Sequence, residues 1–99
     1  MYAVVNQLRF KEPIDLDIFK KAESDLFPKL REVEGFDSLH VIQTSEDTAI
    51  LVIVAQSPEL LDRLATEIGS PFMVANVVAH LSGPPERQLG AIVVSTQYG

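Results

Sequence analysis

The architecture of this chain follows from one run of residues, Thr48-Ala49-Ile50-Leu51-Val52-Ile53-Val54-Ala55-Gln56. Every residue from position 49 to position 55 is apolar, and alternate side chains of a strand point to opposite faces of a sheet. Both faces of this predicted strand are therefore apolar, which indicates a place in the middle of a sheet. Ser57-Pro58 follows at once and predicts a helix start, with serine as N-cap and proline at the first helical position.

The elements around this strand predict a ferredoxin-like fold. Residues 36–44 form a second strand-like run, and the polar turn Ser45-Glu46-Asp47 joins the two runs into a hairpin. Two further strands are expected, over 2–10 and 88–97. A helix is expected over 15–33, kinked by Pro28 and ended by Gly35, and another over 58–68, ended by Gly69. A last helical segment, apolar nearly all round, is expected from Ser70-Pro71 to Leu81. This β-α-β-β-α-β order predicts one α+β domain over residues 1–99, a four-stranded antiparallel sheet with helices on one face.

The sheet face without helices is expected to be apolar as well. Residues 49–55 are apolar on both faces, and the last strand nearly so, with Leu89 and Val93 on one side and Ile92 and Val94 on the other. Such a face needs a cover, and the simplest cover is a second copy related by a two-fold axis. We therefore predict a homodimer through the helix-free sheet face, in which two chains pair into a dimeric α/β barrel.

The composition limits the partners and the compartment. The net charge is −6, with 8 basic and 14 acidic residues, whereas a face that binds nucleic acid is basic. The uncharged stretch 68–85 is interrupted by Gly69, Pro71 and Gly83, so no membrane span is expected. The chain has no cysteine and shows no basic leader before an apolar segment, which fits a cytoplasmic protein. We expect no nucleic-acid and no membrane partner.

Asn6 is the polar residue that stands out in the first strand. It shares a strand face with Val4, Leu8 and Phe10, which look like the core-facing set. A buried amide costs on the order of 1–3 kcal/mol unless it is hydrogen-bonded. Two explanations stay open at this point. Either a protein partner satisfies Asn6 in a closed core, or the face opens into a pocket where Asn6 meets a ligand.

Three short motifs carry a family resemblance. They are the Glu34-Gly35-Phe36 step from helix to strand within residues 27–36, the Ser57-Pro58-Glu59 helix start, and the Ser70-Pro71-Phe72 start of the last helical segment. Together with the element order, they resemble the antibiotic-biosynthesis-monooxygenase branch of the dimeric α/β-barrel superfamily. This superfamily includes cofactor-independent and haem-degrading monooxygenases, lactone isomerases and proteins without a known reaction. The resemblance thus implies the fold and leaves several reactions open.

The haem-degrading branch of this superfamily uses an asparagine on the first strand, a tryptophan after the third strand and a histidine on the second helix. In this chain Asn6 matches the first of these, but Ala55 stands at the tryptophan position and Asn76 at the histidine position. His80 lies one helical turn beyond Asn76. The two histidines are far apart in sequence, so no local spacing of metal ligands appears. We therefore expect no metal, haem or flavin cofactor, and a haem-degrading monooxygenase is the less favoured possibility.

By this resemblance, the leading expectation is a cofactor-independent monooxygenase that oxidises an aromatic quinol, phenol or polyketide-like molecule with O2. Such a protein needs an apolar pocket, an acceptor for the phenolic proton and donors for the resulting anion. Asn6 and Asn76 can donate hydrogen bonds, and His40 and His80 are the available imidazoles. We predict Asn6, His40 and His80 as catalytic residues. The predicted substrate-binding residues are Val4, Leu8, Phe19, Phe72, Met73, Asn76 and Val77.

Structural roles remain possible for both histidines. His40 shares a strand face with Phe36, Ser38 and Ile42; it looks into the helix side if Phe36 does, or is a partly exposed strand residue. His80 suits the end of a helix, where the dipole favours a cation. The alternative function is a non-catalytic small-molecule-binding or stress-related protein on the same barrel. Convergence of the two asparagines and a histidine on one cavity favours the enzyme, and a shortage of polar pocket residues favours the alternative.

Overall fold

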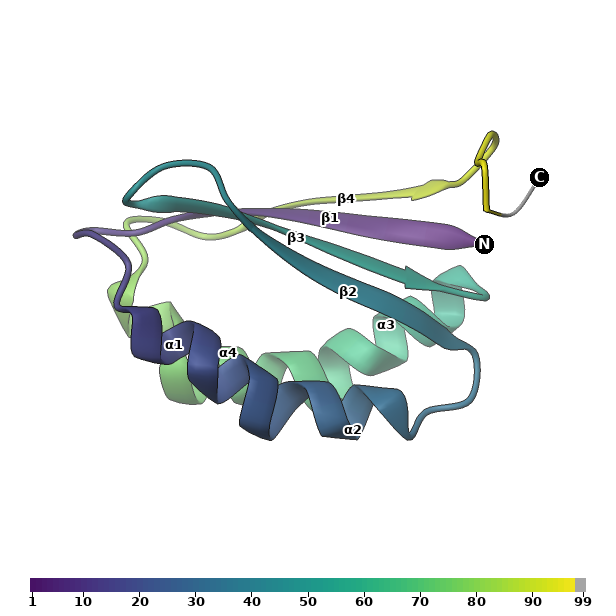
Figure 1. Cartoon of the computed structure of the whole chain (residues 1–99), viewed down its shortest axis with the longest axis horizontal. Helices are drawn as coiled ribbons and strands as arrows, with labels where there is room; N and C mark the ends of the chain where they lie inside the picture. The colour runs from purple at the N-terminus through teal and green to yellow at the C-terminus, as the bar shows by residue number, and fades with distance from the viewer. Residues whose placement is uncertain (98–99) are drawn as a thin grey trace.

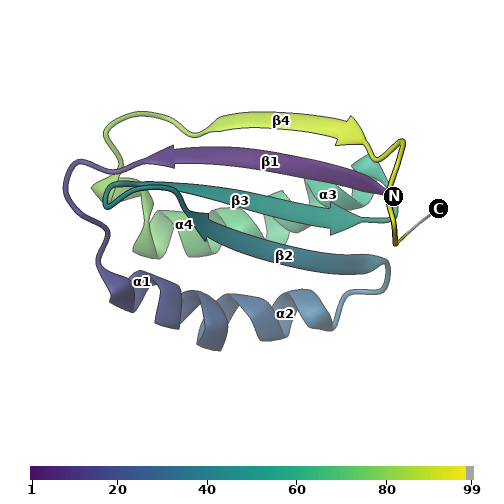
Figure 2. The same ribbon diagram turned by 45° about the horizontal axis from the view of Figure 1, so that its top comes forward.

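The protein, described by a computed structural model over residues 1–97, has a four-stranded antiparallel sheet with its helices on one face (Figures 1 and 2). The strands are hydrogen-bonded in the order β2-β3-β1-β4. Their bounds are β1 (Tyr2–Arg9), β2 (Phe36–Gln43), β3 (Thr48–Ala55) and β4 (Glu86–Ala91). The predicted α+β, ferredoxin-like βαββαβ fold is confirmed.

The apolar strand β3 lies inside the sheet, as its sequence predicts, with β2 on one side and β1 on the other. Ala49 and Ala55, near its two ends, are almost fully buried under the helices. Ser57 then caps the next helix, because its side chain accepts a hydrogen bond from the Leu60 N–H at 3.1 Å. Asp15 caps the first helix in the same way and accepts from the Asp17 N–H at 3.0 Å.

Two helical paths run beneath the sheet, and each contains a π-helical segment. The first is α1 (Leu16–Lys21), η1 (Ala22–Leu26) and α2 (Phe27–Arg31); the second is α3 (Pro58–Leu64), η2 (Ala65–Gly69) and α4 (Ser70–Asn76), followed by the 3-10 turn η3 (Val78–His80). The prediction that Gly69 ends a helix is wrong, because the path continues through it. A proline lacks an N–H and crowds the preceding turn, and in both paths the wider π turn comes just before Pro28 or Pro71.

The last helix and the last strand differ from the predictions. No residue of α4 is buried, and Val74 is 71% exposed, so the expectation of a helix buried nearly all round is wrong. The helix packs beside η1 and leaves its outer side open. β4 covers Glu86–Ala91 instead of 88–97, since its pairing with β1 begins opposite Gln7 and ends opposite Tyr2.

The core consists of two separate clusters. One gathers around Val4, Ala55 and Leu61, and the other around Leu8 and Val77 at the opposite end of the sheet. Both clusters use the helix-facing side of β1. Asn6 lies on that same side between Val4 and Leu8, so the gap between the clusters falls at the one polar residue of this stretch of β1.

Gly35 turns the chain from α2 into β2 and is expected to tolerate no side chain. Its φ is +91°, and a Cβ there would lie 2.7 Å from Leu60 Cδ2 and 3.0 Å from Gln56 Oε1. Gly35→Ala should therefore lower the free energy of unfolding by about 1–3 kcal/mol in urea denaturation. Gly83→Ala is the control, because a Cβ at Gly83 meets no atom within 4 Å. Equal stability of the two variants would contradict the prediction.

Candidate functional site

A cleft of about 360 Å³ lies between the sheet and the helices, in the gap between the two core clusters. Its walls are apolar side chains from the middle of the sheet and from both helical paths. They are Leu26, Leu30, Leu39, Leu51, Ile53, Leu64, Ala65, Met73, Val74, Val78 and Pro85. The polar side chains that line it are Asn6, Ser70 and Arg87. The arrangement is typical of a small-molecule site, an apolar cavity with a few polar groups that orient the ligand.

Asn6 lines this cleft, as one of the two explanations for it requires. The residue is half-buried and lies opposite Leu51 in the pairing of β1 with β3. Among residues 1–97 its amide has no hydrogen-bond partner, and no buried side-chain polar atom is left unsatisfied there. The amide therefore faces open space in the cleft and is available to a ligand.

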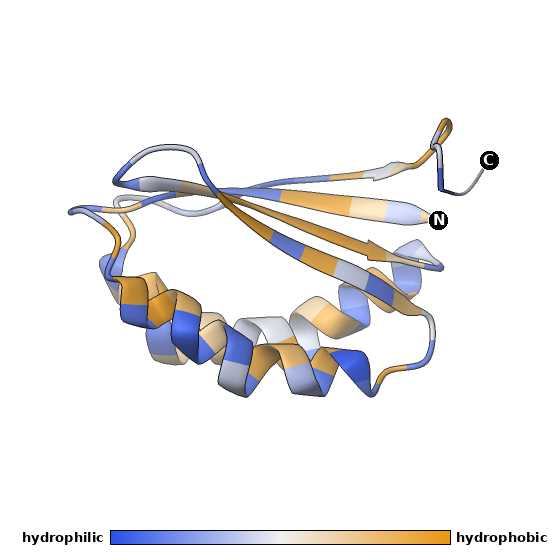
Figure 3. Cartoon of the chain, in the orientation of Figure 1, coloured by the Kyte–Doolittle hydropathy of each residue, from blue (hydrophilic) through white to orange (hydrophobic). Residues whose placement is uncertain are grey.

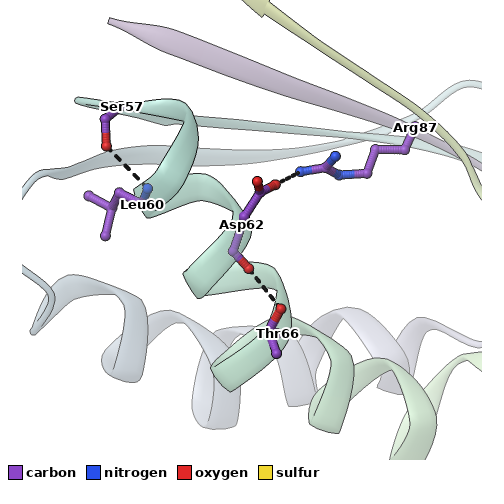
Figure 4. Close-up of polar contacts among 5 residues, drawn as sticks. All are labelled: Ser57, Leu60, Asp62, Thr66 and Arg87. Carbon is purple, nitrogen blue, oxygen red and sulfur yellow. Dashed lines mark hydrogen bonds and ion pairs between the residues drawn. The ribbon is translucent and has the colours of Figure 1, made fainter.

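Arg87 is a charged residue of the site that the sequence does not predict. It pairs with Asn6 across the β1–β4 ladder, so both side chains are on the cleft face of the sheet. Figure 4 shows the Arg87 side chain reaching from β4 to Asp62 on α3, where Nη2 donates to Oδ1 at 2.8 Å. The sequence predicts that the last strand begins only at residue 88, which leaves Arg87 outside it. The alternation of Arg87, Leu89 and Ala91 opposite Asn6, Val4 and Tyr2 is the signal that could have located it.

His40 is exposed on the helix-free face of the sheet, so of its two alternatives the exposed strand residue fits and the view toward the helices is wrong. It pairs with Val52, whereas Leu39 and Val41 pair with the cleft-side residues Ile53 and Leu51. The cause is a register shift between Phe36 and Ser38, where one extra residue reverses the alternation of faces. Counting by twos from Phe36 therefore places His40 on the wrong side.

Asn76 and His80 lie outside the cleft. The Asn76 side chain donates to the backbone carbonyl of Phe72 at 3.1 Å and borders a separate surface depression near Pro28. His80 is exposed and borders another depression near Phe10. The expected helical spacing fails here because α4 ends at Asn76 and the backbone of Val77, with φ −124° and ψ −47°, starts a 3-10 turn. The structure does not bring His40, Asn76 or His80 to the cleft that Asn6 lines.

The predicted apolar wall is divided between the cleft and the core. Met73 lines the cleft. Val4, Leu8 and Val77 are buried in the two clusters, and Phe19 and Phe72 pack against them. These residues hold the sheet and helices together on either side of the cavity. Much of its actual wall comes instead from the middle of β3 and from the π-helical segments.

Comparison with known proteins identifies the fold. No protein-family model and no curated protein sequence matches the chain. Among solved structures, it is similar to the NE2512 protein of unknown function from Nitrosomonas europaea (TM-score 0.78, 15% identity, 95% of this chain and 90% of that one). It is also similar to SnoaB, a cofactor-independent oxygenase from Streptomyces nogalater (TM-score 0.72, 11% identity, 96% and 95%). A third is the ActVA-Orf6 monooxygenase of Streptomyces coelicolor in complex with nanaomycin D (TM-score 0.68, 17% identity, 95% and 92%).

The chain has the fold of the antibiotic biosynthesis monooxygenases. The resemblance noted in the sequence is thus confirmed at the level of fold, over nearly the whole chain. Identities below 20% show a shared fold, and the reaction has to be argued from the residues of the cleft. Within residues 1–97, no group of three or more His, Cys, Asp or Glu side chains could hold a metal ion, and no helix has the length and hydropathy needed to cross a membrane.

Haemin is expected to form no tight one-to-one complex with this antibiotic-biosynthesis-monooxygenase fold. By the resemblance noted in the sequence, Asn76 matches the position of the haem-ligand histidine. Its side-chain amide donates to the Phe72 carbonyl, and His80 lies outside the cleft. A titration of the wild-type chain should therefore show no Soret shift that saturates at one haemin per chain. Saturation at that ratio, lost in His80→Ala, would contradict the prediction.

Proposed function

We propose that this protein is a cofactor-independent monooxygenase that oxidises an electron-rich aromatic molecule with O2. The observation that carries the proposal is the pairing of Asn6 and Arg87 on adjacent strands, which brings two side chains with N–H donors to the lining of a mostly apolar cleft. Donors that are fixed in an apolar site stabilise a developing oxyanion far better than water does. A phenol or quinol that enters the cleft with its hydroxyl toward this pair would ionise more readily.

In this proposal the substrate supplies the electrons. Loss of the phenolic proton gives an anion stabilised by Asn6 and Arg87. The anion passes one electron to O2, and the resulting radical pair joins at a ring carbon and takes up a proton to give a hydroperoxide. Loss of water then leaves a carbonyl, so that, counted in the keto tautomer of the phenol, a ring CH2 and O2 become C=O and H2O. The chain has to bind, orient and stabilise the anion, which Asn6, Arg87 and the apolar wall are suited to do.

Two similar structures support this choice of reaction. SnoaB is named as a cofactor-independent oxygenase, and the ActVA-Orf6 monooxygenase was solved with nanaomycin D. A specific observation also supports a second candidate, the non-catalytic binding protein. No imidazole or carboxylate is among the described residues that line the cleft, so no side chain there is suited to take the phenolic proton at neutral pH. An oxygenase with this cleft must act on a substrate acidic enough to ionise beside Arg87.

Oxygen uptake with anthrone decides between the two candidates. Protein treated with EDTA should consume one O2 for each anthraquinone formed, above the rate of the uncatalysed blank, as measured with an oxygen electrode and by absorbance. Anthrone that binds without uptake above the blank would contradict the oxygenase and leave the binding protein. Dependence of the uptake on added iron or flavin would contradict the cofactor-independent mechanism.

We also propose that two chains associate through the helix-free face of the sheet and that the protein works in the cytosol, which a cysteine-free chain suits. A row of side chains crosses this face in the order His40, Val52, Val5 and Gln88. Figure 3 shows the apolar stretch along β3 at the centre of the sheet. No helix covers the apolar side chains on this face of the sheet. Such uncovered apolar side chains favour association with a second copy of the chain.

A further inference from the structure

We propose that Asp62 is a specificity-determining residue, which engages Arg87 and thereby biases the cleft toward aromatic molecules that arrive without a negative charge. The proposal rests on the proposed use of the cleft as a ligand site. It concerns the choice of substrate rather than the reaction. Neutral phenols and quinols are the favoured class, and aromatic carboxylates and sulfonates are the disfavoured class.

The geometry places Asp62 at the edge of the cleft and in contact with its cation. Arg87 lines the cleft, whereas Asp62 lies on α3 outside the set of lining residues and contacts the guanidinium from the helix side. The contact joins Nη2 to Oδ1 at 2.8 Å. A guanidinium has five N–H donors, so others remain for a ligand hydroxyl beside Asn6. Asp62 therefore orients Arg87 without removing it from the site.

The contribution of this ion pair to the stability of the fold is too small to explain why the two residues are paired. The Arg87 and Asp62 side chains are 40% and 66% exposed. Ion pairs that are as open to water as this one contribute little to folding. A weak pair can nevertheless act on ligands, because a molecule with a permanent negative charge must compete with Asp62 for Arg87 and is also repelled by the carboxylate. A hydroxyl that is neutral when it binds does not meet this cost in the binding step. Discrimination of this kind works by an unfavourable contact with the wrong ligand.

Two fluorescent probes with the same aromatic body test the proposal. 8-Anilino-1-naphthalenesulfonate carries a sulfonate, and N-phenyl-1-naphthylamine is the neutral analogue. Asp62→Asn should tighten the anionic probe about threefold to fivefold and leave the neutral probe within about 1.5-fold, the size of effect that an exposed pair allows. Asp62→Glu, which keeps the charge, should restore most of the wild-type ratio of the two dissociation constants.

Three controls tie the effect to this contact. Glu59→Gln removes the same charge from the first turn of α3, outside the cleft-lining set and without an ion pair to Arg87, and should leave the ratio unchanged. In an Arg87→Gln background, Asp62→Asn should tighten the anionic probe less than it does in the wild type, because competition for Arg87 is gone and only repulsion by the carboxylate remains. Ala65→Phe, which fills the cleft, should abolish the binding of both probes.

Several outcomes would overturn the proposal. They are an unchanged or weakened anionic probe in Asp62→Asn, an equal effect of Glu59→Gln, or retention of both probes by Ala65→Phe, which would place the probes elsewhere. The result is separable from the oxygenase reaction, since it needs no turnover. A shifted probe ratio without any O2 uptake would support the role of Asp62 and contradict the oxygenase. O2 uptake that depends on Arg87, together with an unshifted ratio of the two probe dissociation constants, would support the oxygenase and contradict the role of Asp62.

Discussion

Replacing Arg87 by glutamine is expected to lower the kcat of O2-dependent quinone formation by about a hundredfold. Loss of one preorganised oxyanion donor typically costs about two to three orders of magnitude in rate, and Arg87 is the charged donor that lines the cleft. The variant should fold normally, because the ion pair that it loses is solvent-exposed. The measurement is O2 uptake at saturating anthrone, with urea denaturation to check that stability has changed by less than about 1 kcal/mol.

Arg9→Gln is the matched control for this result. It removes the same charge from β1, but Arg9 is exposed and outside the cleft, so the rate should be unchanged. Asn6→Ala should also lower the rate while leaving stability within about 1 kcal/mol, because no protein group would lose a partner. An unchanged rate in both Asn6→Ala and Arg87→Gln would contradict the role of the donor pair. A loss of about 1–3 kcal/mol in Asn6→Ala, with the rate retained, would instead indicate a structural amide.

The parts of the site that follow a simple repeat could be predicted from the sequence. β1 is regular along its length, so counting by twos correctly groups Asn6 with Val4 and Leu8. The run of apolar residues in β3 identifies the strand at the centre, and Ser57 identifies a helix start through its capping side chain. In each case one local rule, the strand alternation or the N-cap, determines the outcome without help from distant contacts.

The parts that could not be predicted depend on single-residue irregularities. The register shift between Phe36 and Ser38 reverses the face of His40, and the changed backbone at Val77 takes His80 away from the helical repeat. The alternation of Arg87, Leu89 and Ala91 indicates that these residues share a face, but the sequence does not show that Arg87 lies opposite Asn6, and this pairing makes it a site residue. One inserted residue or one changed dihedral angle costs little energy locally and redirects every later side chain of its element.

Val52→Glu is expected to convert the proposed dimer into a monomer. Val52 lies in β3 between Val5 and His40 on the helix-free face, so the new carboxylate of one chain would be desolvated against the apolar centre of the other. Light scattering at micromolar concentration should give twice the chain mass of 10.9 kDa for the wild type and a single chain mass for the variant. Gln43→Glu adds the same charge at the exposed end of β2 and should stay dimeric.

A wild-type chain that is monomeric in light scattering would contradict the proposed dimer. Val5, Ile50 and Val52 would then be left uncovered on the helix-free face. It would leave the site argument untouched. The cleft lies on the helix-covered side of the sheet, opposite the proposed interface. Loss of O2 uptake in monomeric Val52→Glu would therefore have to act through the sheet itself. Val52 pairs with Val5, the neighbour of Asn6, so a distorted β1 would shift Asn6 and Arg87. Uptake that is restored at higher protein concentration would show that association keeps β1 in place.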